Sequence, residues 1–310
     1  MHSEAELLRS VGKVAQLAEG NRWHRLRHRP LGYPAAQLYR TLAYPLLRRP
    51  LAVDCPTFFG RSMRVMLPSG TDIFLTGGKT HESELRLARY LIRALHYGDT
   101  FLDIGAHYGY FALLAAHCTG DQGRVIAVEA APATFAVLRY NAENAGVEAY
   151  HAAASDTSGE LEFLEFPNLY AEYNTLDTGR YSKEKWYGKN TPVRVSVPAV
   201  RMDDFLNERK LYPVLIKIDV EGAEFQVIRG MTEYLENSQV AVAMEYLSDK
   251  RGNAEHRQAD TFLRERGYLP YAIDNAGIPY AVHDVPAHLE SRRLDSDNIV
   301  FRRPANTFTA

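Results

Sequence analysis

One ten-residue segment constrains the fold of this chain more than any other. Residues 101–110, FLDIGAHYGY, begin as a short apolar run that ends in Asp103, and Gly105 and Gly109 then bracket a turn. The residues that follow, FALLAA, have the composition of a buried helix. Glycine lets the backbone bend sharply and lets a ligand approach bare N–H groups at a helix start. We therefore predict a strand, a ligand-binding turn and a helix.

A second buried strand is predicted downstream, and it ends in an acid. Residues 125–128, VIAV, are followed by Glu129, which stands 24 positions after Gly105. A carboxylate roughly 20 residues after such a turn is typical of a group that binds ribose hydroxyls. A plain structural turn is the alternative for the glycines taken alone.

The glycine spacing discriminates between nucleotide cofactors. It is Gly-x-x-x-Gly, whereas close approach to a dinucleotide pyrophosphate uses Gly-x-Gly-x-x-Gly. Asp103 would also repel a pyrophosphate, but it would attract a cationic sulfonium and an ammonium group. S-adenosyl-L-methionine is therefore the predicted cofactor, and NAD is disfavoured.

Six segments resemble, in order, the landmarks of the FkbM family of S-adenosylmethionine-dependent methyltransferases. They are FLDIGAHYGYF (101–111), RVIAVEAAP (124–132), NAEN (141–144), AAASD (152–156), VRMDDFL (200–206) and LIKIDVEGAEFQVIRGM (215–231). The last is the most distinctive, and together they extend over roughly the central half of the chain.

The resemblance implies a class I, Rossmann-like methyltransferase fold, with cofactor contacts at the matching positions. These are Asp103, Gly105, Ala106, His107, Gly109, Tyr110, Glu129, Ala130, Ser155, Asp156 and Asp219. Two positions depart from the family pattern, since His107 stands where members usually carry Asn, and Ala130-Ala131 where they carry Pro-Asn. Such enzymes often methylate natural products or glycans, so the resemblance implies an acceptor of that kind.

The segment LIKIDVEG places ionisable side chains where a predicted parallel strand ends. Open α/β sheets bind ligands outside the carboxyl ends of their strands. Methyl transfer to a hydroxyl is an in-line displacement in which the acceptor loses its proton as the new bond forms. The predicted catalytic residues are Asp219, Glu221, Lys217 and His107. Strand alternation puts Lys217 and Asp219 on one face, where they can form an ion pair.

Other interpretations of these residues stay open. Acids favour the start of a helix, so Glu221, and above all Glu224, also suit a structural role there. His107 as a base would titrate near neutrality, or it is a hydrogen-bonding residue at a helix start. Glu245, at the end of the run VAVAME, can orient a substrate or join Asp219 at a divalent ion. No cluster has diagnostic metal-ligand spacing, so no metal is predicted.

Alternating strands and helices predict a mostly parallel sheet with both faces covered and an antiparallel edge strand. Residues 63–75 predict a hairpin with its turn at 68–70. Residues 80–95 predict a helix whose first residues, His81, Glu82 and Glu84, are candidates to border the cofactor, or a solvated first turn whose acids suit the helix dipole, which is the preferred interpretation. An added β-pair is expected at 160–166 and 194–200. The tyrosine-rich segment between them, 167–192, is long for a loop and suits either acceptor stacking or a packed lid.

The first sixty residues differ from the rest, so we divide the chain into an N-terminal helical extension (1–60) and a methyltransferase domain (61–310). Residues 4–18 predict an amphipathic helix stopped by Gly20. An arginine-rich, aromatic stretch follows, suited to an anionic lipid surface or a partner chain, or to a collar on the catalytic domain. We expect a collar or oligomer contact, because Pro30, Pro34, Pro45 and Pro50 interrupt the stretch.

The composition argues against several classes of protein, namely disulfide-stabilised, nucleic-acid-binding and membrane-spanning proteins. With 310 residues, 46% of them hydrophobic, the chain can bury a core without disulfides, and its two cysteines form no Cys-x-x-Cys pair. A net charge of -2 gives no general attraction to nucleic acid. There is no run of about 18 apolar residues and no signal-peptide layout, so no transmembrane segment and a cytoplasmic location are expected.

Together these features predict an S-adenosylmethionine-dependent O-methyltransferase that acts on a hydroxyl of a small molecule, natural product or glycan. The alternatives are a NAD-dependent oxidoreductase and a non-catalytic methyltransferase-like binding module. An RNA substrate is disfavoured, because the catalytic part shows no basic, aromatic-bearing groove.

Overall fold

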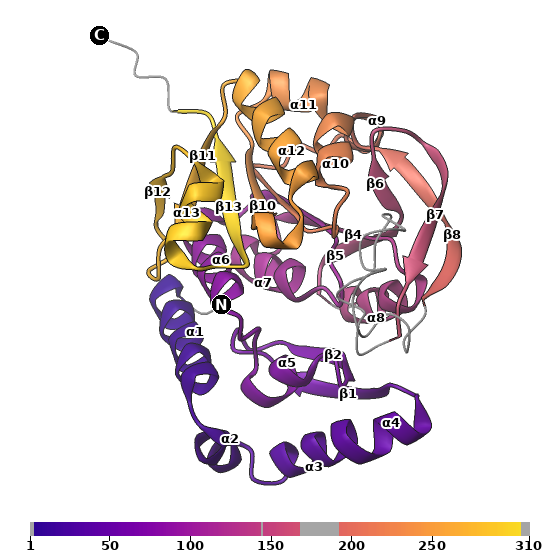
Figure 1. Ribbon diagram of the computed structural model, residues 1–310, viewed down its shortest axis with the longest axis vertical. Helices are drawn as coiled ribbons and strands as arrows, with labels where there is room; N and C mark the ends of the chain where they lie inside the picture. The colour runs from indigo at the N-terminus through magenta and orange to yellow at the C-terminus, as the bar shows by residue number, and fades with distance from the viewer. Residues whose placement is uncertain (1–2, 144, 168–191, 305–310) are drawn as a thin grey trace.

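The computed structural model describes residues 3–143, 145–167 and 192–304. The strands of its central sheet are, in chain order, β3 (Thr100–Ile104), β4 (Arg124–Glu129), β5 (Val147–His151), β9 (Leu215–Ile218), β10 (Ala241–Leu247), β11 (Leu269–Ile273), β12 (Pro279–Ala281) and β13 (Ser296–Arg302). Their order is β12-β11-β13-β10-β9-β3-β4-β5 (Figure 1). Strands β10, β9, β3, β4 and β5 pair in parallel, and β13, β11 and β12 pair antiparallel. The predicted α/β class with an antiparallel edge is confirmed.

Helices cover both faces of this sheet (Figure 1). One face carries α6 (Glu82–Ala94), α7 (Tyr110–Thr119) and α8 (Pro132–Ala142). The other carries α9 (Met202–Glu208), α10 (Glu224–Gly230), α11 (Thr232–Asn237), α12 (Ala254–Glu265) and α13 (Val285–Arg292). Along β3, Phe101 packs into the first core, and Leu102 and Ile104 pack into the second. Burial on both faces explains why these strands are continuous apolar runs.

The strand order reverses beside β3. Moving from β3, the chain adds β4 and β5 on one side of it and later β9 and β10 on the other. The loops that leave β3 and β9 therefore diverge to opposite faces and open a crevice at the carboxyl ends of these two strands. Of the predicted site residues, Gly105, His107, Glu129, Ala130, Asp219 and Glu221 line this crevice.

A smaller sheet stands beside the crevice. Its strands are β6 (Ala153–Ser155), β7 (Gly159–Glu165) and β8 (Val193–Arg201), in the order β6-β8-β7, and β7 pairs antiparallel with β8 as predicted. Ala152 separates β5 of the central sheet from β6 of this smaller sheet. The predicted aromatic loop residues, Tyr170, Tyr173, Tyr181, Trp186 and Tyr187, lie outside the described residues, as does Asn144.

The hairpin expected at 63–75 is wrong in its second half. Strand β2 (Ser62–Leu67) pairs instead with the upstream strand β1 (Leu51–Pro56), so the predicted boundary at residue 60 falls inside this hairpin. Residues Thr71–Thr76 form helix α5. The Phe74 N–H donates to Gly70 O and the Gly77 N–H to Ile73 O, which closes helical turns because β2 already has its partner.

The N-terminal helix α1 (Glu4–Glu19) is part of the folded body. It begins with a capping box between Ser3 and Glu6, and it buries Leu7, Val11, Val14 and Leu17. Helix α1 contacts α6, so this part of the extension packs on the helices that cover the central sheet. Among the described residues, no helix is both long and apolar enough to cross a membrane.

The rest of the extension leaves the body as an arm (Figure 1). It consists of α2 (Arg22–His28), α3 (Gly32–Leu38), a π-helix η1 (Tyr39–Ala43) and α4 (Tyr44–Leu47). Its side chains Leu38, Leu42 and Leu46 are 59%, 63% and 83% exposed, so the packing expected of a collar does not extend to them. Helix α3 packs against α5, and Arg29, at the end of α2, lies over the Phe74 ring of α5.

The prolines also do not break the arm as predicted. Helical backbone continues from Gly32 to Leu47. The π-helix accounts for this, since the Tyr44 N–H bonds to Tyr39 O and Pro45 then falls in the first turn of α4. A proline there costs little, because the first N–H groups of a helix have no intrahelical acceptor.

Candidate active site

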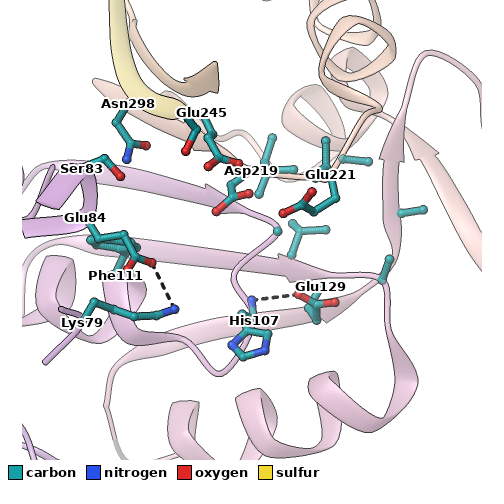
Figure 2. A pocket seen from close by; sticks show the side chains of 18 of the residues that line it. Lys79, Ser83, Glu84, His107, Phe111, Glu129, Asp219, Glu221, Glu245 and Asn298 are labelled. Carbon is teal, nitrogen blue, oxygen red and sulfur yellow. Dashed lines mark hydrogen bonds and ion pairs between the residues drawn. The ribbon is translucent and has the colours of Figure 1, made fainter. Parts of the chain in front are cut away.

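A cavity of about 380 Å³ opens at the carboxyl ends of β3, β4, β9 and β10 (Figure 2). One wall comes from the segment that leads into α6, and another from β6 and β7. Its lining residues are Lys79, His81, Ser83, Glu84, Ile104, Gly105, His107, Phe111, Val128, Glu129, Ala130, Ala152, Ala153, Ala154, Phe163, Asp219, Val220, Glu221, Glu245, Arg251, Ser296 and Asn298. It occupies the ligand-binding position of an open α/β sheet.

The turn after β3 requires glycine at its first bend. Gly105 has a φ of 72°, and a Cβ atom added there would lie 1.8 Å from the backbone oxygen of Asp219. The N–H groups of Gly105 and Ala106 both donate to Val128 O, at 2.9 and 3.1 Å. Three strand ends are thereby joined at one point, which fixes the floor of the cavity.

Glu129 presents its carboxylate at the end of β4. One oxygen, Oε2, accepts the His107 N–H at 2.8 Å, and the other, Oε1, accepts the Ala131 N–H at 2.8 Å (Figure 2). Burial raises the pKa of Glu129 to about 7, although these two backbone bonds oppose the rise. Each carboxylate oxygen has a second lone pair, so Glu129 can still accept hydrogen bonds from a ligand.

Lys217 lies behind this floor and neutralises two acids. Its Nζ is 3.3 Å from Asp103 Oδ1 and 3.4 Å from Asp219 Oδ2, and it donates to Gly105 O at 2.9 Å. The predicted ion pair between Lys217 and Asp219 is confirmed. Burial lowers the pKa of Lys217, but the charges of Asp103 and Asp219 raise it more. Asp103 is fully buried and does not line the cavity, so its role is that of a counter-ion to Lys217.

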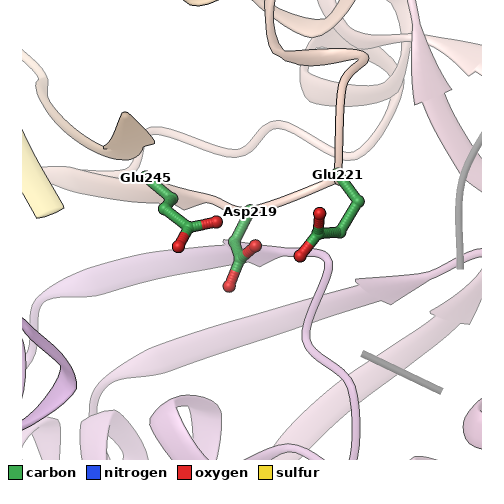
Figure 3. Close-up of side chains that lie close together, drawn as sticks. All are labelled: Asp219, Glu221 and Glu245. Atoms are coloured by element: carbon green, nitrogen blue, oxygen red, sulfur yellow. The ribbon is translucent and has the colours of Figure 1, made fainter. Parts of the chain in front are cut away.

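Three carboxylates converge across the cavity from Glu129. Oxygens of Asp219, Glu221 and Glu245 lie within 4.8 Å of one another (Figure 3). Burial, and then the charges of Asp219 and Glu221, raise the pKa of Glu245 well above its usual value. No metal was predicted because the sequence spacing is not diagnostic, yet the fold brings together three oxygen ligands that can hold one divalent cation.

The loop after β9 is held in shape by a fourth acid. Glu221 has a φ of 53° and Gly222 a φ of 103°. Glu224, which is fully buried, accepts the Val220 N–H at 3.3 Å and the Gly222 N–H at 3.0 Å, and its carboxylate lies 3.4 Å from His256. The structural role expected for Glu224 is confirmed, and strain at Glu221 is retained by this support.

His107 lines the cavity but does not titrate as expected. Burial, and then the charges of Lys79 and Lys217, lower its pKa well below the usual 6.5. The ring packs on Tyr108 with centroids 3.8 Å apart, and its backbone has a φ of 52°. The prediction of a base that titrates near neutrality is therefore wrong, because burial, and then two nearby ammonium groups, disfavour the imidazolium.

The other predicted cofactor contacts divide into two groups. Ala130 lines the cavity, whereas Ala106, Gly109, Tyr110, Ser155 and Asp156 do not. The Tyr110 ring packs on Phe58 and Phe59, and Asp156 pairs with Arg229. Around β6 the cavity is lined by Ala152, Ala153 and Ala154, and not by Ser155 or Asp156.

Sequence reasoning missed several lining residues. His81 and Glu84 line the cavity as expected and Glu82 does not, but Lys79, Ser83, Phe163, Arg251, Ser296 and Asn298 were not predicted. Lys79 pairs with Glu84 at 3.1 Å (Figure 2), and Arg251 belongs to the short 3-10 helix η4 (Asp249–Arg251). Asn298 lies opposite Glu245 in the β10–β13 register. Only tertiary pairing brings these residues to the site, so no local motif identifies them.

The sheet order and the site at its point of reversal define a class I, Rossmann-like methyltransferase fold. Residues 103–270 match the family model of the methyltransferase FkbM domain, which is more than half of the chain. The chain belongs to this family.

Known proteins resemble the chain in parts. Methyltransferase 1 of Beauveria bassiana (strain ARSEF 2860) is 29% identical over 184 residues, which cover 55% of this chain and 72% of the relative. Methyltransferase sdnD of Sordaria araneosa is 32% identical over 173 residues, covering 46% of this chain and 64% of the relative. The solved methyltransferase FkbM of Methylobacillus flagellatus KT is 15% identical, with a TM-score of 0.38, over 66% of this chain and 43% of that one.

Proposed function

We propose that the protein is an S-adenosylmethionine-dependent O-methyltransferase acting on a hydroxyl of a small molecule, natural product or glycan. Family membership supports methyl transfer over the nicotinamide alternative. The observation that supports the proposal is one cavity lined by two unlike groups of residues. In this proposal Glu129 marks one end and the carboxylates of Asp219, Glu221 and Glu245 mark the other, and the Gly105 turn lies between them, against the Asp219 backbone.

The Glu129 end suits the cofactor. Ribose hydroxyls are donors, and the buried carboxylate of Glu129 is an acceptor at the end of the second strand. Bare backbone at Gly105 lets a ligand approach closely. When bound, S-adenosylmethionine supplies an electrophilic methyl group on its sulfonium, and the acid-lined end of the cavity favours that positive charge.

The three-carboxylate end suits an acceptor hydroxyl. In the proposed reaction the acceptor oxygen forms a bond to the methyl carbon, the carbon–sulfur bond breaks, and S-adenosylhomocysteine leaves with the bonding electron pair. The hydroxyl proton passes to a carboxylate of this cluster. A raised pKa makes Glu245 a stronger base than an ordinary carboxylate, and its assistance increases as pH rises through that pKa because only the ionised form accepts the proton. Asp219, held by Lys217, and Glu221 complete the acceptor surface.

Cofactor binding is tested by isothermal titration calorimetry. We expect saturable heat with S-adenosylmethionine and with S-adenosylhomocysteine, and none with NAD. The opposite pattern, tight NAD binding without a response to either sulfur compound, rejects the proposal.

The role of the three carboxylates is tested by measuring turnover. A panel of hydroxylated compounds is first screened to find an acceptor. Asp219→Asn, Glu221→Gln and Glu245→Gln should each lower kcat far more than they weaken cofactor binding, because a base acts in the transition state. Glu290→Gln, an exposed acid on α13 away from the cavity, is the matched control. Near-native rates in all three variants contradict the assignment.

Chelation separates a base acting alone from one assisted by a cation at the same carboxylates. We expect activity to survive EDTA, since Lys217 already neutralises part of the charge. Loss on chelation, with recovery on adding Mg²⁺ or Mn²⁺, would move the acceptor activation from Glu245 to a bound ion.

We also place the reaction in the cytoplasm. Both cysteines, Cys55 and Cys118, are free thiols, which suits a reducing compartment.

A further inference from the structure

The arm that leaves the body, residues 22–49, is called the arginine arm below. From Gly20 to Val53 the sequence contains no Asp or Glu, and it contains seven arginines, at positions 22, 25, 27, 29, 40, 48 and 49. The whole chain has a net charge of -2, so the remainder is acidic and the arm is a concentrated positive region. Such a field selects anionic partners.

The same arm exposes large apolar side chains. Trp23 is 68%, Leu31 86% and Leu47 56% exposed, in addition to the three exposed leucines already described. Only Ala36 and Tyr44 are buried between residues 22 and 49. Single exposed leucines are ordinary on protein surfaces, but a cluster of exposed apolar side chains is typical of a surface that binds a membrane or another protein.

The leucines follow helical spacing. Leu38, Leu42 and Leu46 are four residues apart on the unbroken helical backbone from Gly32 to Leu47. Side chains at this spacing lie along one side of a helix. The arm therefore presents an apolar stripe, and its arginines are interleaved with that stripe along the chain.

The arginines divide into anchored and available groups. Arg25 donates to the carbonyls of Leu17 and Ala18 at the end of α1, at 3.1 and 2.7 Å, and Arg29 stacks over Phe74. These two fix the arm to the body. Arg22, Arg27 and Arg40 are exposed, and within the part of the chain that the structure describes no acid pairs with them.

We propose that the arginine arm docks the protein on an anionic lipid surface. The leucines and Trp23 enter the boundary between headgroups and acyl chains, and the exposed guanidinium groups bind lipid phosphates. The positive charge and the apolar stripe of the arginine arm together favour an anionic lipid surface over a second copy of the protein or a nucleic acid. A second copy of the arm would bring like charges together with no acid to neutralise them, which opposes self-association. Nucleic acid would satisfy the arginines but leave the leucine stripe in water.

Sedimentation with lipid vesicles tests the proposal on the full chain. The probes are vesicles of phosphatidylcholine alone and vesicles containing about 30% phosphatidylglycerol. We expect the protein to pellet with the anionic vesicles at low salt and to be released as salt rises, because screening weakens the arginine contacts. Light scattering without lipid should report a monomer mass.

Two triple variants separate the contributions. Arg22→Gln with Arg27→Gln and Arg40→Gln should weaken anionic-vesicle binding about 100-fold, from about 1 kcal/mol for each arginine. Leu38→Ser with Leu42→Ser and Leu46→Ser should abolish pelleting, with an unchanged melting temperature because these side chains are exposed. Controls on other faces are Arg139→Gln with Arg293→Gln and Tyr212→Ser with Ile278→Ser, which should bind like the parent.

Three results overturn the proposal. The first is absence of the parent from anionic vesicles at low salt. The second is equal, salt-independent binding to phosphatidylcholine. The third is a dimer mass that the leucine variant converts to monomer, which assigns the stripe to a second copy. Cofactor binding is unaffected in every case, so this test is independent of the proposed activity.

Discussion

At the scale of single residues, Glu129 combines two properties that pull its ionisation in opposite directions. The site buries the carboxyl, which favours its neutral form, and supplies two backbone donors, which favour its charged form. The pKa of about 7 means that small changes in the surroundings move the group between donor and acceptor.

This balance predicts that cofactor affinity depends on pH. Ribose hydroxyls need the ionised carboxylate, so binding of S-adenosylmethionine should tighten as pH rises through about 7. The effect on stability has the opposite sign. Without cofactor, the folded state keeps a proton between pH 4.5 and about 7 that the unfolded chain has lost, so this contribution to stability falls as pH rises through that window.

Calorimetry across this pH range measures the effect, with Glu129→Gln as the matched variant. Glu129→Gln should lose the pH dependence and bind about 10- to 100-fold more weakly, since a charge-assisted hydrogen bond is replaced by a neutral one. A pH dependence that persists in Glu129→Gln assigns the titration to another group.

Gly105 gives a prediction with an internal control. Gly105 and Gly98 both have positive φ, but a Cβ atom meets Asp219 O at 1.8 Å at the first and nothing within 4 Å at the second. Gly98→Ala should cost about 1 kcal/mol from backbone strain alone. Gly105→Ala should cost well over 2 kcal/mol in urea unfolding, since the strand ends must separate. Equal costs would show that the contact is unimportant.

At this scale the sequence predicts what lies within one motif. Gly105, Glu129 and Asp219 each follow a buried strand, so their meeting at one sheet edge follows from the parallel topology. Asn298 and Ser296 come from the last strand, which inserts antiparallel between β10 and β11, and no spacing encodes that insertion. The titration of His107 was mispredicted because its burial, and its proximity to Lys79 and Lys217, arise only in the folded chain.

At the scale of elements, α6 and β13 are joined by a buried ion pair. Arg86 Nη2 lies 2.7 Å from Asp297 Oδ1, and the two side chains are 2% and 1% exposed. The same two elements supply Ser83, Glu84 and Asn298 to the cavity. The ion pair therefore positions the acceptor wall.

Breaking this pair should destabilise the fold strongly. Arg86→Ala leaves Asp297 buried without its partner and should cost about 3–5 kcal/mol. Arg194→Ala, which removes an exposed pair with Glu162 at 2.9 Å, should cost about 1 kcal/mol or less. Urea unfolding measures both. Recovery of stability in Arg86→Met with Asp297→Leu would identify charge burial as the cause, and similar costs for the two single variants would count against it.

Elements buried on both faces were predicted well, whereas the hairpin at 63–75 was predicted only in part. The apolar runs of β3, β4 and β9 admit few other placements. Residues 73–75 are a short apolar run that also suits a strand, but β1 pairs with β2, and residues 71–76 form a helix instead. Partner choice between neighbouring strands is a tertiary property, so local pattern does not determine it.

At the scale of the whole molecule, the extension has two unlike halves. Helix α1 contributes to the main core, and the arginine arm contributes almost nothing to it. The predicted proline breaks would have prevented a continuous arm, but the π-helix accommodates Pro45.

A pair of matched substitutions separates the two halves. Val11→Asp puts a charge at a fully buried position of α1 and should cost about 3 kcal/mol or more. Leu42→Asp, on the exposed stripe, should change the free energy of unfolding by less than about 0.5 kcal/mol. A large cost at Leu42 would mean that the arm is a packed collar after all.

The contact between Gly105 and the Asp219 backbone has a consequence for how such an enzyme diversifies. Under the proposed function, it joins the turn that binds the cofactor to the strand that carries the acceptor acids, so the sheet sets the distance between the two halves of the reaction. Acceptors of new size or shape must be accommodated by the surrounding walls, which are the start of α6, the end of β13 and the small sheet. Substrate range can change there without disturbing the line along which the methyl group travels.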